Sequence, residues 1–274
     1  MLTTALLSLL LVSGDPCTGT DAPTAPVVNP AVDTALLNIE ANGGPSTFTA
    51  DIAYRKDEAL LSRSEIRIGR VVFERPEGEQ GVLGIRFDTR VLGSRREAER
   101  KRIIFENGWL IEIDKARQLT IKRQLVHDGE SMDPMRLGGP FPLPVGQKRD
   151  DVLLRFAVTL GSTPTHPMFK SIAGTPDLVA LHLVPRMNTP EADTWTSIDL
   201  WYDPATWLPV AVEARETNDD VRRIRLTNAT RDVPLKRLDR GVLFSDSSMD
   251  DWTVDVRPLP NPEPDTQSTG AHAE

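Results

Sequence analysis

The sequence predicts a mainly β protein of the α+β class, a strongly curved antiparallel sheet or incomplete β-barrel of about 11 strands with helices on the concave side. Three observations support this prediction. Short segments of alternating apolar and polar residues follow one another through most of the 274 residues. Two segments have the spacing of amphipathic helices. One proline-rich segment interrupts the strands, and no internal repeat is evident.

The stretch from Arg102 to Leu125 shows the alternation most clearly. Asn107 and Gly108 tolerate the positive φ that a type I′ turn requires, so they predict a tight hairpin. Apolar residues alternate with charged ones on both sides of this turn. Such a sheet exposes its charged face to solvent and buries its apolar face. The functional question is what covers the apolar face.

The other strands are predicted from the same alternation. Around Gly69 the apolar residues change from even-numbered positions (Ile66, Ile68) to odd-numbered ones (Val71, Phe73), which predicts a β-bulge. The charged segment from Gly93 to Lys101 is predicted as a connection. The expected strands and short apolar pieces are Phe48 to Arg55, Glu65 to Arg75, Val82 to Arg90, Leu178 to Pro185, Ser197 to Asp203, Leu208 to Arg215, Val221 to Ala229, Val242 to Phe244 and Trp252 to Val256.

Two helices and one irregular loop complete the predicted domain. Ala31 to Asn42 and Arg149 to Leu160 both have apolar residues near helical spacing and an acidic first turn. Met132 to Val145 carries four prolines and two glycines, which excludes a ladder strand. We call it the flap, because long ordered loops are often lids, although a plain connection fits the sequence equally well.

The termini are predicted to lie outside the folded domain. Residues 1–14 are apolar and end in small residues typical of a signal-peptide cleavage site, but no Lys or Arg precedes the run, so a buried first strand or helix is the alternative. Residues 15–30 are predicted to be a flexible linker, 31–258 one domain and 259–274 a disordered tail. Cys17 is the single cysteine, and because Asp15 and Pro16 precede it we do not expect lipid anchoring there.

Composition argues against several functions. The net charge of −8 disfavours a nucleic-acid partner. The four histidines, His127, His166, His182 and His272, have no metal-ligand spacing, and motifs for serine hydrolases, dinucleotides and phosphate loops are missing. We therefore expect no catalytic residue, no metal and no cofactor. The five tryptophans are expected either in the core or along an apolar ligand cavity.

The order of these elements resembles the LolA-like family, which includes periplasmic lipoprotein carriers, the receptor LolB and sensor domains of the RseB type. The resemblance covers about Ala31 to Pro258. It rests on the order of several strand-end patterns, and the flap region looks like the version found in planctomycete-type bacteria. The patterns are FERP (Phe73 to Pro76), FENGWLIEID (Phe105 to Asp114), LHLVPR (Leu181 to Arg186), IDLWYDPATWLPVAVEARE (Ile198 to Glu216) and IRLTNATRD (Ile224 to Asp232).

This resemblance implies a periplasmic, monomeric, non-enzymatic carrier of lipid or lipoprotein acyl chains in a half-barrel cavity, with membrane-bound loading and accepting proteins as further partners. The family's carriers lock their lid with an arginine, for which Arg55, Arg67 and Arg86 are possible here. The alternatives are an envelope-stress sensor or protein-interaction domain on the same fold, and a hydrolase with an unrecognised cleft. The in-facing residues expected to line the cavity are Ile52, Tyr54, Ile66, Ile68, Leu83, Ile85, Phe87, Trp109, Ile111 and Ile113, with Phe141 and Leu143 of the flap closing over them.

Overall fold

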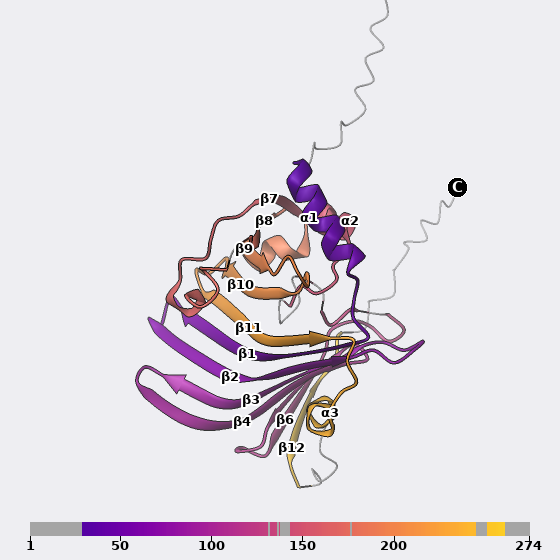
Figure 1. Ribbon diagram of the computed structural model, residues 1–274. Coiled ribbons are helices and arrows are strands. Elements are labelled where there is room, and N and C mark those ends of the chain that lie inside the picture. The colour runs from indigo at the N-terminus through magenta and orange to yellow at the C-terminus, as the bar shows by residue number, and fades with distance from the viewer. Residues whose placement is uncertain are drawn as a thin grey trace, which may run out of the picture.

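The computed structural model describes residues 29–130, 132–135, 137, 143–175, 177–244 and 251–260. In this part of the chain, twelve strands form one strongly curved, open sheet with the order β12-β6-β5-β4-β3-β2-β1-β11-β10-β9-β8-β7 (Figure 1). The fold class predicted from the sequence is therefore confirmed. The strands are β1 (Thr47–Glu58), β2 (Arg63–Glu74), β3 (Val82–Leu92), β4 (Arg95–Glu106), β5 (Trp109–Asp114), β6 (Leu119–Gln124), β7 (Phe156–Leu160), β8 (Val179–Pro185), β9 (Trp195–Tyr202), β10 (Pro209–Glu216), β11 (Val221–Arg231) and β12 (Thr253–Arg257).

Three α-helices and two short 3₁₀-helices accompany the sheet in the described residues. Helix α1 begins where the Asn29 side chain accepts a hydrogen bond from the Ala31 N–H, with proline at the first helical position. Its apolar stripe is buried in the main core together with α2, whereas α3 packs on the opposite face of the sheet. The helices are α1 (Pro30–Ala41), α2 (Arg149–Arg155), α3 (Arg237–Leu243), η1 (Pro167–Phe169) and η2 (Pro190–Asp193).

The sheet consists of two meanders joined by the pairing of β1 with β11. The predicted hairpin turn is present, with φ of 49° at Asn107 and 77° at Gly108. The register of β2 and β3 shifts between Ile68 and Gly69, so the expected bulge is confirmed, but the extra residue is Asp88 of β3. Strand β12 pairs with β6 in parallel, which the expected meander did not include.

Three sequence-based assignments are wrong. The charged segment from Gly93 to Lys101 is mostly strand, because its charges lie on an exposed end of β4 that pairs with β3. Helix α2 ends at Arg155, and the following residues form the edge strand β7, which pairs with β8. Val242 belongs to α3, where it is buried next to Leu243 against Val72 of β2.

The main core fills the concave side of the sheet. Side chains from the strands meet the apolar stripe of α1, α2 and the flap. Four flap residues are between 0 and 2% exposed, so this segment contributes as much to the core as a strand does: Met135, Leu137, Leu143 and Val145. Where α1, α2 and the flap pack on the sheet, the protein's own side chains cover the concave face.

Gly146 allows the segment after the flap to approach the end of α1. Its φ is +63°, and an added Cβ would lie 2.4 Å from the carbonyl oxygen of Gly43. Gly146→Ala is expected to cost about 1–2 kcal/mol for the left-handed backbone and about 1–3 kcal/mol more for the overpacking. Gly93 is the matched control, because its φ is +56° and nothing lies within 4 Å of its added Cβ.

Urea denaturation of both variants gives the free energies of unfolding. Gly93→Ala should show the backbone cost alone. Equal destabilisation by the two substitutions would contradict the close approach of Gly146 to Gly43.

Candidate functional site

The structure brings together half of the residues expected to line a cavity. Ile52, Tyr54, Leu83, Ile85 and Phe87 share the concave face and belong to the main core, with exposed fractions of 7% or less. Leu143 of the flap lies in the same core and is fully buried. These positions are packed in the state that the structure shows, and contact with a ligand stays a prediction.

The other expected lining residues of the strands lie on the outer face of the sheet. Ile103 and Phe105 pair with the concave residues Ile85 and Leu83, and Phe105 pairs in turn with Leu110. The concave residues of β5 are therefore the even-numbered ones. The outward residues are Trp109, Ile111 and Ile113 in β5, and Ile66 and Ile68 in β2. Phe141 lies outside the described residues.

The turn itself contained the information needed to avoid this error. A two-residue loop at Asn107 and Gly108 pairs Glu106 with Trp109 and Phe105 with Leu110. Since paired residues share a face, Leu110 and not Trp109 must face the same side as Phe105. The sequence alternation placed the wrong residues of β5 on the concave face because β5 carries apolar residues on both faces. Alternation alone does not show which of two apolar faces is the inner one.

Buried polar groups hold the flap in place. The Gln147 side chain accepts a hydrogen bond from the Leu137 N–H at 3.0 Å and donates to the Met135 carbonyl oxygen at 2.8 Å. The Tyr202 hydroxyl donates to the Pro144 carbonyl oxygen at 2.9 Å, and complete burial raises the pKa of Tyr202, which keeps this donor protonated. Each bond satisfies a backbone group that would otherwise be buried without a partner.

Arg155 contacts the flap through buried bonds, and the sequence did not single it out. Its guanidinium donates to the Leu137 carbonyl oxygen at 2.8 Å and forms a buried ion pair with Glu191 at 2.7 Å. Of the three arginines considered from the sequence, Arg55 and Arg86 lie on the outer face beside carboxylates of their own strands. Arg67 lies on the concave face and contacts Glu65 and Glu99.

Beyond Tyr54 the concave face becomes charged. A small cavity of about 190 Å³ there is bordered by Arg67, Lys101, Arg222 and neighbouring side chains. Lys101 lies 3.1 Å from Glu112, which also contacts Arg123. The apolar part of the concave face is thus confined to the end that the flap covers.

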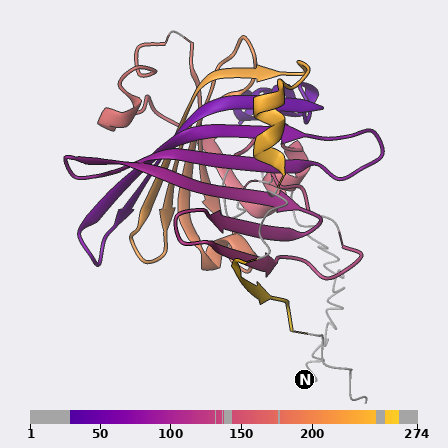
Figure 2. The ribbon, with the colours of Figure 1, turned by 90° about the horizontal axis from the view of Figure 1, so that it is seen from below.

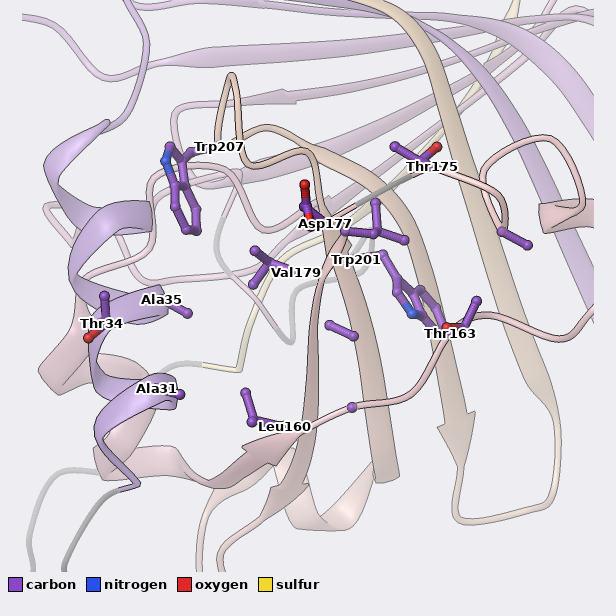
Figure 3. Close-up of a pocket in the computed structure, with 14 residues that line it drawn as sticks. Ala31, Thr34, Ala35, Leu160, Thr163, Thr175, Asp177, Val179, Trp201 and Trp207 are labelled. Atoms are coloured by element: carbon purple, nitrogen blue, oxygen red, sulfur yellow. The ribbon is translucent and has the colours of Figure 1, made fainter.

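A larger hollow of about 760 Å³ lies where α1 meets the free edge of β7 and β8. Figure 3 shows Ala31 and Ala35 of α1 on one side, Val179 in the middle and Trp201 on the other side. Strand β7 ends at Leu160, so the first residues of β8 pair with β9 on one side and border the hollow on the other. The lining residues are mostly small or apolar: Ala31, Thr34, Ala35, Leu160, Gly161, Thr163, Ala173, Thr175, Asp177, Leu178, Val179, Ala180, Trp201 and Trp207.

Two tryptophans in the hollow's wall are held by specific contacts. The Trp201 indole N–H donates to the Ser162 carbonyl oxygen at 2.8 Å, which fixes the ring on the outer face. Trp207 has φ of 53°, a left-handed conformation that is strained for a bulky residue. Asp203 holds this turn, since its carbonyl oxygen accepts the Trp207 N–H at 2.7 Å. Such strain tends to occur at ligand-binding positions.

Two histidines in the described residues, His182 and His166, have side-chain contacts. His182 Nδ1 lies 2.7 Å from Asp199, but the neighbouring Thr159 hydroxyl donates to the His182 carbonyl oxygen at 3.5 Å, away from the ring. His166 Nδ1 accepts the Met168 N–H, and burial together with Arg223 and Arg55 lowers the pKa of His166, which favours this neutral capping role. Within the described ranges, no cluster of three metal-binding side chains occurs.

No helix in the described part of the chain is long and apolar enough to span a membrane.

No family model and no curated protein matches the chain. Several solved structures align with most of it at low identity. They include an uncharacterised conserved protein from Thermus thermophilus (11% identity, 83% of this chain and 99% of that chain, TM-score 0.44).

MucB aligns at 12% identity over 79% of this chain and 64% of its own, with a TM-score of 0.46. A LolA superfamily protein from Nitrosomonas europaea aligns at 10% identity over 77% of this chain and 96% of its own, with a TM-score of 0.28. The family that the sequence resembles is thus among these distant structures. We infer no function from likenesses at this level.

Arg155→Met is expected to destabilise the protein by about 3–5 kcal/mol, because it removes one partner of the buried Arg155–Glu191 ion pair. The matched control is Arg86→Met, whose ion pair with Asp88 is solvent-exposed and should contribute about 0–1 kcal/mol. Urea denaturation measures both free energies of unfolding. Limited proteolysis of Arg155→Met should also cut within the flap earlier than in the unchanged protein. Similar stability of the two variants would show that Arg155 does not anchor the flap.

Proposed function

We propose that this protein is a non-catalytic binder of an acyl chain or a similar apolar ligand, which enters the hollow between α1 and the β7–β8 edge. The observation that carries the proposal is the hollow itself, about 760 Å³ in volume and lined mainly by apolar side chains. Ligand sites of this kind typically measure about 300–1,000 Å³. Burying ten methylene groups contributes about 8 kcal/mol before the costs of association, so specific polar contacts are not required.

The hollow adjoins the half-barrel interior in which the family resemblance places an acyl chain. Ala35 belongs both to the hollow's wall and to the main core, and Val179 and Trp207 pack against that core. Since the flap already covers the apolar end of the concave face, a ligand reaches that interior from the hollow only if α1 or the flap moves. The edge hollow is thus the entry position, and the concave face is the deeper position.

A protein-interaction role is the second candidate, and the two free edges of the sheet favour it. In the described residues, β7 and β12 end the strand order, and Val254 and Val256 of β12 are about half exposed. A partner that adds a strand to an open edge would use such a surface. Capture of a stable protein partner from periplasm by the purified protein tests this role, and the capture should fail when β12 is deleted.

Delipidated protein should take up a dansylated fatty acid, with an increase in probe fluorescence. Val179→Asp places a carboxylate in the apolar wall and should weaken binding at least about tenfold, because burying that charge is unfavourable. Leu60→Asp is the control, since Leu60 is 93% exposed in the β1–β2 turn, away from the hollow.

Circular dichroism establishes that both variants are folded. Absence of uptake by the folded, unchanged protein would refute the binding function. Uptake that Val179→Asp leaves intact would place the ligand elsewhere.

A further inference from the structure

Helix α3 lies on the outer face of the sheet, opposite the side that holds the main core. Figure 2 shows it crossing the strands on that face. Val242 and Leu243 of α3 are buried against Val72 of β2. Gly84 of β3 makes this contact possible, because a Cβ there would lie 2.7 Å from the Val242 carbonyl oxygen. The helix is therefore seated firmly in one orientation.

Helix α3 and the residues that flank it expose both apolar and basic side chains. Leu238 is 82% exposed and Phe244 is 60% exposed, and Val233 just before the helix is also exposed. Between them lie exposed basic residues: Lys236, Arg237 and Arg240. We call these six residues the α3 patch. Large apolar side chains exposed together commonly mark an interaction site.

The charge of the α3 patch contrasts with that of the whole chain. The protein carries a net charge of −8, yet Asp239 of α3 turns inward and pairs with Arg70 at 3.1 Å. Arg240 lies 3.0 Å from Glu74. Among the described residues, no carboxylate forms an ion pair with Lys236 or Arg237, so these two charges are available to an anionic partner.

We propose that the α3 patch docks the protein on the surface of a bilayer that contains anionic phospholipids. Lys236 and Arg237 face the phosphate groups, and Leu238 and Phe244 enter the boundary between headgroups and acyl chains. This combination of exposed cations and apolar side chains is that of interfacial membrane-binding segments. An anionic surface is the complementary partner because its charge attracts juxtamembrane Lys and Arg.

This inference is independent of the proposed ligand. The hollow lies beside α1 at the β7–β8 edge of the sheet, and the α3 patch lies over β2 and β3 on the outer face. Membrane docking therefore requires neither an occupied hollow nor a displaced flap. Fatty-acid uptake and vesicle binding can fail separately, which keeps the two proposals distinguishable.

Co-sedimentation of the full chain with vesicles tests the docking. We expect binding to vesicles of phosphatidylcholine with about 30% phosphatidylglycerol at low salt, and much weaker binding to pure phosphatidylcholine. Replacing both cations, Lys236→Gln with Arg237→Gln, should lower the partition coefficient about 30-fold. Leu238→Ser should lower it about tenfold without changing the charge. Leu60→Ser is the matched control, because it removes an exposed leucine from a different surface.

Four outcomes would overturn the proposal. They are no binding to anionic vesicles, equal binding to neutral vesicles, unchanged binding by the α3 variants, and an equal loss in Leu60→Ser. The substitutions are on exposed positions, and circular dichroism with thermal unfolding establishes that each variant is folded. Fatty-acid uptake by the α3 variants should equal that of the unchanged protein.

Discussion

The apolar end of the concave face must be kept from water, and the rest of the structure depends on how this is achieved. In a closed barrel the first and last strands pair with each other, and the sheet itself encloses this face. Here the described sheet ends at β7 and β12, so α1, α2 and the flap supply the missing cover. The cover is built from separate pieces of chain, and the hollow lies at the boundary between α1 and the β7–β8 edge.

The edge strand β7 shapes the boundary next to α1. Because β7 stops at Leu160, the start of β8 has no neighbouring strand on that side within the described residues. Small residues of α1 face this gap, and Ala35 has too little volume to fill it. The hollow thus results from a short edge strand that lies beside a helix with small side chains. It adjoins the main core, and the core residues stay packed.

Sequence reasoning predicted the sheet well because alternation and turn chemistry are local. The hairpin at Asn107 and Gly108, most of the strands and α1 follow from neighbouring residues. It failed where tertiary pairing decides: Phe156 to Leu160 has helical spacing but joins the sheet edge, and the charged half of β4 pairs despite its composition. The hollow could not be predicted, since its wall combines α1, β8 and the turn at Trp207, which are distant in sequence.

The contacts of the flap show that displacing it costs more free energy than filling the edge hollow. Displacing the flap exposes four nearly fully buried apolar side chains and breaks the hydrogen bonds of Gln147, Tyr202 and Arg155. Burial of each such apolar side chain contributes about 1.5–3 kcal/mol, so opening the flap alone costs much of the stability of a typical domain. Filling the edge hollow breaks none of these contacts. On the proposed function, a ligand would therefore bind first at the edge, and the free energy gained there would be available to move the flap.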